Sequence, residues 1–332
     1  MTLMSRIAPQ LIALAALVAL VSVFYPGFLS VEVQNDRLVG PVIDILKRSA
    51  PVALLAVGMT LVIATRGIDL SVGTIMAICG AAAAWALTAG LGAGAALALA
   101  LGAGLLAGLW NGVLVAVVGI QPFVATLILM TMGRGVAQLI TEGRILTFTD
   151  PGFSWLGSGT ALGLPVPVWI WLATAAAAAL LMRRTALGLL VEAVGINRRA
   201  ALLAGVNATV LLIAVYVASG FCAALAGIIV TADIRGADAN NAGLWLELDA
   251  ILAVVIGGNS LLGGRFSIAA SVLGALIIQT ISAGILLAGF ASEYNLIIKA
   301  GLVLVILILQ SPRIASEWRL WRDSHRAQGG RA

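Results

Sequence analysis

Residues 65–73, TRGIDLSVG, place Arg66 and Asp69 inside an apolar stretch that runs from residue 50 to residue 87. A charged side chain within a bilayer is costly and needs a partner, water or a function. Asp69 or Ser71 would cap the following helix by accepting its free N–H groups, and Arg66 would pair with Asp69 or extend to the membrane surface. Alternatively, the break lines a path for polar solutes. Capping is the simpler interpretation, because it explains a Gly-x-Asp-x-Ser pattern without a ligand.

The other chemically active side chains are too few and too scattered for an enzyme. The two lysines, Lys47 and Lys299, follow no Gly-rich phosphate loop, so the chain has no Walker A motif of its own. His325 is the single histidine, and Cys79 and Cys222 lack metal-ligand spacing. No catalytic triad or HExxH motif is present. We therefore expect no catalysis, metal or cofactor, and energy must come from an ion gradient or from a partner chain.

Composition places the chain in a membrane. Of its 332 residues, 61% are hydrophobic and 10% are charged, and the mean hydropathy is +1.11. A soluble domain typically carries about 25% charged residues, so this chain cannot cover itself with polar surface. Its apolar runs are long and do not alternate, which favours helices over a barrel. We predict an all-α, polytopic membrane protein.

Ten apolar segments are predicted to form transmembrane helices, some of them broken by Gly-rich stretches. Their ranges are residues 8–25, 50–65, 70–89, 93–118, 122–141, 166–182, 207–231, 248–257 with its continuation, 266–288 and 294–310. The first is interpreted as a retained span, because its apolar stretch is longer than that of a secretion signal and no cleavage pattern follows. Residues 8–310 would form a single membrane domain between a short N-terminus, residues 1–7, and a basic tail, residues 311–332.

Basic residues indicate which side faces the cytoplasm. Lys and Arg concentrate in the cytoplasmic loops of membrane proteins. Here they lie at the N-terminus, between the sixth and seventh segments and in the tail: Arg6, Arg183, Arg184, Arg198, Arg199, Arg313, Arg319, Arg322, Arg326 and Arg331. We therefore place both termini in the cytoplasm. The tail is interpreted as contacting anionic lipid headgroups and not nucleic acid.

A second interruption, within residues 249–277, repeats the layout of apolar run, Gly-containing polar break and apolar run. Aligning Gly67 with Gly258 and Gly73 with Gly264 gives a loose internal repeat, which is typical of duplicated transporter folds. Asn111 would face a path or bond a neighbouring helix. The candidates for a translocation path or a helix break are Asp69, Ser71, Asn111, Gly257, Gly258 and Asn259.

Four stretches carry a family resemblance. GMTLVIATRGIDLSVG, IQPFVATLILMTMGRGVAQLIT, GINRRAALLAGVN and ELDAILAVVIGGNSLLGGR resemble, in this order, the permease subunits of bacterial monosaccharide ATP-binding-cassette importers of the ribose type. The similarity covers residues 37–310, and residues 232–258 look closest to the galactofuranose type. The resemblance implies a type II-like importer permease with loosely repeated halves in the bacterial inner membrane.

The same resemblance implies the partners. They are a cytoplasmic ATPase, a periplasmic sugar-binding protein and a second permease chain, which in the galactofuranose type is a different chain, so that the pore is a heterodimer. The monosaccharide would then be galactofuranose, or alternatively ribose or a related sugar. A secondary transporter driven by an ion gradient is the competing interpretation, although it would need acidic residues in mid-span.

Residues 183–207 match the family's coupling segment. A short helix would begin near Asn197, a favourable N-cap residue, with Arg198 and Arg199 outward, and Gly205 would end it. Small side chains would allow close docking in an ATPase groove. The residues assigned to coupling are Gly195, Asn197, Arg198, Arg199, Ala200, Ala201, Ala204 and Gly205. The alternative is an ordinary cytoplasmic loop that obeys the positive-inside rule.

The loop at residues 232–249 is polar, acidic and aromatic, and we expect it on the periplasmic side. It would dock the binding protein through Asp233, Arg235, Asp238 and Asn240. A plain solvated loop is the equally simple alternative, because exposed loops are polar by default.

Overall fold

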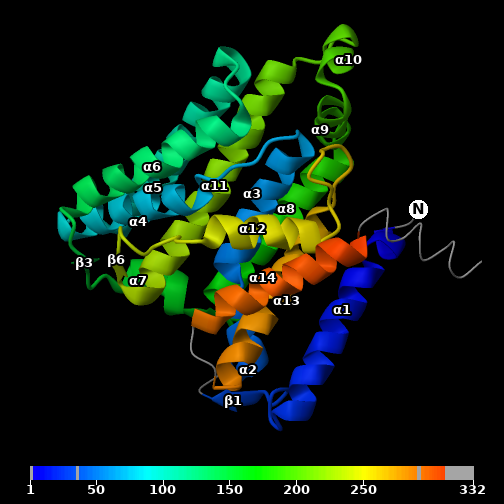
Figure 1. The fold of residues 1–332 in the computed structure, drawn as a ribbon. Coiled ribbons are helices and arrows are strands. Elements are labelled where there is room, and N and C mark those ends of the chain that lie inside the picture. The colour runs from blue at the N-terminus through cyan, green and yellow to red at the C-terminus, as the bar shows by residue number, and fades with distance from the viewer. Residues whose placement is uncertain (1–2, 35–36, 290–292, 311–332) are drawn as a thin grey trace, which may run out of the picture. The chain divides into compact units, whose positions relative to one another are not determined.

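The computed structural model describes residues 3–34, 37–289 and 293–310, and these form mostly helices (Figure 1). The α-helices are α1 (Leu3–Phe24), α2 (Pro41–Arg48), α3 (Ala50–Ala64), α4 (Val72–Thr88), α5 (Gly92–Val113), α6 (Pro122–Thr141), α7 (Pro151–Ser158), α8 (Val166–Arg184), α9 (Leu187–Ile196), α10 (Arg198–Leu203), α11 (Ala208–Ile234), α12 (Leu246–Ile256), α13 (Ile268–Leu287) and α14 (Glu293–Gln310). A π-helix, η1 (Leu114–Val118), continues α5.

Three two-stranded antiparallel ladders join the loops. β1 (Glu32–Gln34) pairs with β2 (Arg37–Val39), and β4 (Thr160–Ala161) pairs with β5 (Leu164–Pro165). β3 (Leu146–Thr147) pairs with β6 (Gly236–Ala237), which fastens the loop after α6 to the loop after α11. All three are short, so the helices determine the fold.

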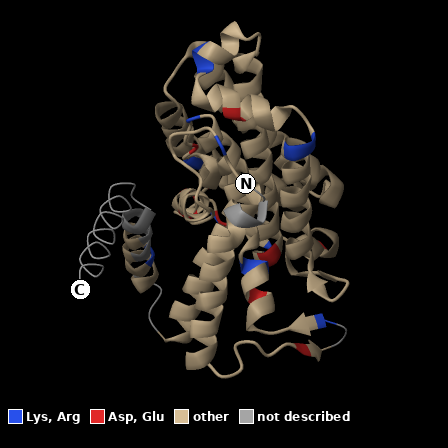
Figure 2. Ribbon diagram, turned by 90° about the vertical axis from the view of Figure 1, so that its right-hand side faces the viewer, with Lys and Arg blue, Asp and Glu red and all other residues tan. Residues whose placement is uncertain are grey.

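Each of the ten predicted segments coincides with a helix, and this confirms the polytopic helical architecture. In the described part of the chain, six helices are long and apolar enough to cross a membrane: α1, α5 with η1, α6, α8, α11 and α13. A seventh span results if α2 and α3, bent by 42° at their junction, count as one. α4 and α12, with 17 and 11 residues, are shorter. The protein is therefore a multi-pass membrane protein, and charged residues occupy little of its ribbon (Figure 2).

The chain divides into two compact units, Met1–Thr280 and Ile281–Ala332. The second contains the last part of α13 and α14, and the basic tail lies outside the described residues. The first contains the core, in which α3 is buried on all sides from Val52 to Ala64. A helix that is apolar all round belongs inside a bundle, and α3 packs against α8, α11 and α12.

Small residues let α11 approach α5 closely. A methyl group on Gly108 would overlap the carbonyl oxygen of Tyr216, and one on Gly104 would lie 2.6 Å from that of Gly220. Such contacts are the usual basis of helix packing in membranes, where dispersion contacts replace a hydrophobic driving force. The Gly and Ala runs of α5 are therefore packing surfaces.

Several helix connections meet at one end of the first unit, which we name the α9 end. They are the first connection (residues 65–71, between α3 and α4), the second connection (residues 257–267, between α12 and α13), and the α9–α10 segment (residues 187–204). The opposite end, with β3, β6 and α7, is named the β6 end. In Figure 1 the loop after α3 approaches α9 and the loop after α12.

Candidate functional site

The first connection is held by a buried carboxylate. Asp69 is fully buried. Its Oδ1 accepts hydrogen bonds from the backbone N–H of Ser71 at 3.0 Å and from the Ser71 hydroxyl at 2.6 Å. Its Oδ2 accepts one from the hydroxyl of Ser219, on α11, at 2.8 Å. Asn111, on α5, donates from Nδ2 to the Ser71 hydroxyl oxygen at 2.8 Å. The start of α4 is thus bound to both α5 and α11.

This arrangement corrects the expected capping and pairing. Ser71 occupies the N-cap position of α4, yet its side chain makes no cap hydrogen bond. Asp69 accepts from Ser71 itself, which precedes the helix, and not from the free N–H groups of the first turn. Arg66 does not pair with Asp69, because its guanidinium turns toward backbone carbonyl groups elsewhere. In place of a helix cap, the carboxylate therefore makes a local turn with Ser71 and one tertiary hydrogen bond with Ser219.

The second connection is held by a buried amide. Asn259, 8% exposed, donates from Nδ2 to the carbonyl oxygen of Val254 at 3.2 Å, to that of Ser267 at 3.4 Å and to the hydroxyl of Ser271 at 2.8 Å. Its Oδ1 accepts from the backbone N–H of Ser267 at 2.6 Å. The hydroxyl of Thr60, on α3, donates to that of Ser271 at 2.6 Å. The start of α13 is thereby bound to α3.

The burial of the six candidate residues helps to choose between a translocation path and a helix break. Asp69, Ser71 and Asn111 have no exposed surface, and the hydrogen bonds above point into the bundle. Gly257 is buried, and a methyl group there would lie 2.7 Å from the carbonyl of Ala270. Gly258 is exposed, with φ +79. The hydrogen bonds of these residues support the helix-break interpretation.

The α9–α10 segment has the predicted local structure. Asn197 separates α9 from α10, and its side chain accepts a hydrogen bond from the backbone N–H of Ala200 at 3.1 Å, which makes it the N-cap of α10. Gly205 follows with φ +85, the left-handed geometry that ends many helices. Arg198 and Arg199 are exposed, and Arg198 Nη2 donates to the carbonyl oxygen of Ala116 in η1 at 3.4 Å.

The small residues of α10 are not all available for docking, which corrects one expectation. Ala201 is 5% exposed and packs inside the chain. Ala200 and Ala204 are exposed. Between them the helix presents Leu203, 91% exposed, which sequence reasoning missed. An apolar residue kept at the tip of a basic loop is the signal that could have identified it.

Gly195 allows the α9–α10 segment to touch both connections. A methyl group on Gly195 would overlap the carbonyl oxygen of Ala64, at the end of α3, and would lie 2.8 Å from the backbone nitrogen of Gly264. That nitrogen donates to the Ala64 carbonyl oxygen at 2.9 Å. Three backbone segments therefore meet where only hydrogen fits as a side chain.

Arg66 joins the same three segments, and its role was also missed. Its Nε donates to the carbonyl oxygen of Leu262 at 2.9 Å, and its Nη2 donates to that of Ile196 at 2.7 Å. Leu262 lies in the second connection, and Ile196 is the last residue of α9. The signal in the sequence was an arginine inside an otherwise apolar stretch, which needs a partner, water or a function.

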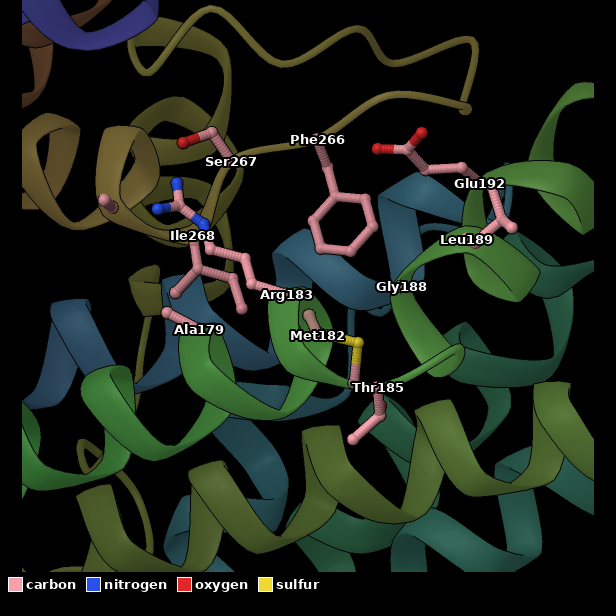
Figure 3. A pocket seen from close by; sticks show the side chains of 11 residues that line it. Ala179, Met182, Arg183, Thr185, Gly188, Leu189, Glu192, Phe266, Ser267 and Ile268 are labelled. Carbon is pink, nitrogen blue, oxygen red and sulfur yellow. The ribbon is translucent and has the colours of Figure 1, made fainter. Parts of the chain in front are cut away.

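A cavity of about 320 Å³ lies beside this contact, between the α8–α9 turn and the second connection (Figure 3). The ring of Phe266 reaches into it, with the guanidinium of Arg183 on one side and the carboxylate of Glu192 on the other. Packing on this side of α9 is open, so the Gly195 and Arg66 contacts are its tight connection to the two helix breaks.

The β6 end carries the expected docking residues. Asp233 forms a 2.7 Å ion pair with Lys47, while Arg235 and Asn240 are exposed. Asp238 accepts from the backbone N–H groups of Asn240 and Asn241 and from the Asn241 side chain. The Asn241 hydrogen bond in particular lowers the pKa of Asp238, so this carboxylate stays charged.

Arg134, on α6, binds the loop between α11 and α12. Its Nη1 donates to the carbonyl oxygens of Ala239 at 2.9 Å and Ala242 at 2.7 Å. Gln138, four residues along the same helix, donates to Oδ1 of Asn240 at 2.8 Å. The sequence places the two on one helix face, but only the structure supplies their partners.

Among the residues that the structure describes, no group of three His, Cys, Asp or Glu side chains is placed to hold a metal ion. Cys79 and Cys222 are buried free thiols.

Comparison with known proteins agrees with this architecture. The galactofuranose transporter permease protein YtfT of Escherichia coli (strain K12) is 62% identical over 308 residues, which cover 93% of this chain and 90% of the relative. The fructose import permease protein FruF of Bifidobacterium longum is 41% identical, covering 94% and 89%. The ribose import permease protein RbsC of E. coli (strain K12) is 40% identical, covering 92% and 93%. No solved structure matches the chain.

A family model, described as the branched-chain amino acid transport system / permease component, matches residues 42–307. These residues include both connections and the α9–α10 segment. The expected resemblance to importer permeases is thereby confirmed, and so is the expectation of a membrane subunit that carries no catalytic function. The chain belongs to the branched-chain amino acid transport system permease component family.

Proposed function

We propose that this chain is the permease subunit of an ATP-driven importer for a monosaccharide, and that the sugar is galactofuranose. The supporting observation is 62% identity to a galactofuranose transporter permease over nearly the full length of both chains. The relatives named for fructose and ribose are about twenty percentage points less similar. They define the alternative substrates, ribose and related monosaccharides.

The family implies an ATPase and a binding protein as partners. We extend this to a second permease chain of different sequence, which together with this one encloses the path, and to anionic lipid at the basic tail. Residues 8–310 act as one membrane domain. The α9 end faces the cytoplasm with both termini, because basic side chains gather there: Arg66, Arg183, Arg184, Arg198, Arg199 and Arg265.

The α9–α10 segment docks on the ATPase. Leu203 would enter an apolar groove, with Ala200, Ala204 and Arg199 around it. Leu202, 49% exposed, adjoins Leu203, and exposed apolar surface rimmed by polar residues marks protein–protein interaction sites. The β6 end would receive the binding protein at Asp233, Arg235, Asp238 and Asn240, three of which are exposed. Asp233 lies in the last turn of α11 and not in the loop where it was expected, and the other three lie in the loop that follows.

Uptake by vesicles tests the function. The chain is reconstituted with its ATPase, second permease and binding protein, and entry of labelled galactofuranose, ribose and galactose is measured with and without ATP. Methyl galactofuranoside and methyl galactopyranoside, whose ring forms cannot interconvert, serve as competitors. We expect ATP-dependent uptake that only the furanoside inhibits. Accumulation by the chain alone on a proton or sodium gradient would establish the ion-coupled alternative instead.

Replacing Leu203 with aspartate tests the docking surface. Desolvating a new carboxylate in an apolar groove should weaken ATPase binding by about tenfold or more, measured by co-purification and by binding in detergent. Leu162→Asp is the matched control, because Leu162 is 89% exposed and lies on the β4–β5 turn. Equal ATPase binding by the two variants would remove α10 from the interface.

A further inference from the structure

Arg66 stands in an unusual backbone conformation at the end of α3. Its φ is +64, in the left-handed region that residues other than Gly, Asn and Asp seldom occupy. Such a conformation persists only where the surroundings support it, and it is a reason to look for a function. Here it directs the guanidinium away from Asp69 and toward the α9–α10 segment.

The two hydrogen bonds of Arg66 use adjacent N–H groups of one planar fork. The carbonyl of Ile196 is at the C-terminus of α9, where the last carbonyl groups have no partner within the helix and a positive charge is favourable. The carbonyl of Leu262 belongs to the second connection. One side chain that begins in the first connection thus contacts the other two segments.

Independent contacts show that the three segments are adjacent at this point. The N–H of Gly264 donates to the carbonyl of Ala64, and Gly195 leaves no room for a side chain between them. A Cβ on Gly263 would lie 2.5 Å from Cγ of Arg66. α9 also packs against α8, where a Cβ on Gly188 would overlap the carbonyl oxygen of Met182, but the Arg66 and Gly195 contacts are the ones described here that join it to both connections.

We propose that Arg66 is a positioning residue that transmits movement of the α9–α10 segment to both helix connections during transport. The inference rests on the proposed function, in which an ATPase moves that segment. When the segment shifts, the paired hydrogen bonds move the ends of α3 and α12 together, and the starts of α4 and α13 follow. Without Arg66, the ATPase would still bind and hydrolyse ATP, but the helices would no longer respond.

Replacing Arg66 with lysine separates this role from the simple need for a positive charge on the cytoplasmic side. Lysine keeps the charge but has no planar fork for two parallel hydrogen bonds. In the complete complex, we expect Arg66→Lys to reduce both sugar-stimulated ATPase activity and ATP-dependent uptake by about tenfold, from the loss of one charge-assisted hydrogen bond. Basal ATPase activity and co-purification of the ATPase should stay at the wild-type level.

Arg265→Lys is the matched control. Arg265 is an exposed arginine in the second connection, and no hydrogen bond joins its guanidinium to any residue in the described ranges. We expect it to behave as wild type. Arg66→Gln, which keeps one amide NH₂ group but loses the charge and the planar fork, should show the same separation between basal and stimulated activity as Arg66→Lys. It serves as the test variant if the lysine form is poorly produced.

Hydrogen exchange distinguishes this role from a loss of charge or a folding defect, because neither would confine the nucleotide-dependent change to one segment. A non-hydrolysable ATP analogue should change the exchange of residues 187–204, 65–71 and 257–267 in the wild-type complex. In Arg66→Lys the change should be confined to residues 187–204.

The outcomes are distinct. If the wild-type complex shows no ATP-dependent uptake, that result contradicts the proposed function and not the role of Arg66. If the wild-type complex transports sugar and Arg66→Lys matches it, the inference is overturned. Loss of ATPase binding in Arg66→Lys would overturn it as well, because Arg66 would then act in docking.

Discussion

The first and second helix connections solve the same packing problem with different chemistry. Each must turn the chain between two helices at the α9 end while burying polar backbone. In the first, Asp69 only accepts hydrogen bonds, from one N–H and two hydroxyl groups. In the second, Asn259 donates to two carbonyls and a hydroxyl and accepts from one N–H.

The difference follows from the neighbours that each side chain meets. Serine hydroxyl groups can donate or accept, so the surroundings of Asp69 can rearrange around a changed partner. Backbone carbonyl groups only accept, so the surroundings of Asn259 cannot. The two positions should therefore respond unequally to the exchange of carboxylate and amide, although both are buried.

Asn259→Asp should have the largest effect on the free energy of unfolding. The new carboxylate oxygen would face the carbonyls of Val254 and Ser267, and the Ser271 hydroxyl would be its one possible donor there. A buried charge without adequate partners costs about 3–5 kcal/mol. Denaturation in detergent measures the loss, with Asn240→Asp as a control that adds the same charge on an exposed residue. Equal stability of the two variants would contradict the hydrogen bonding described here.

Gly195→Ala should have the second-largest effect. It should lower the free energy of unfolding by about 1–3 kcal/mol through overpacking, because the added methyl group overlaps the Ala64 carbonyl oxygen. Separating α9 from the two connections should also lower sugar-stimulated ATPase activity more than basal activity. Gly94→Ala, at an exposed position of α5 with no atom near the added methyl group, should leave both unchanged. A drop in both activities by the same factor would show that Gly195 serves folding alone.

Asp69→Asn should have the smallest effect. It should lower the free energy of unfolding by about 1 kcal/mol, which is the typical contribution of one hydrogen bond. The amide oxygen can keep both bonds from Ser71, and the Ser219 hydroxyl can turn to accept from the amide nitrogen. Transport should stay near the wild-type level in the vesicle assay. Abolished uptake with unchanged stability would instead assign Asp69 to the translocation path and would remove the parallel between the two connections.

Much of the architecture was readable from local patterns. The apolar runs predicted ten helical segments, Asn197 and Gly205 predicted the ends of α10, and the four family stretches predicted an importer permease. These features depend on residues near one another in the chain, where side-chain hydrophobicity, N-cap preference and glycine geometry act directly. The hydrogen-bond partners of buried polar groups could not be predicted from such local patterns.

Composition and motif spacing were enough to predict a helical membrane protein and to show that the chain lacks a Walker A motif. The folded structure was needed to show that Arg66 binds Ile196 and Leu262 and not Asp69. It was also needed to show that Asp69 accepts a hydrogen bond from Ser219, and that Ala201 is buried while Leu203 is exposed. Those contacts join residues separated by up to about two hundred positions, and a hydrogen bond depends on where backbones meet in space.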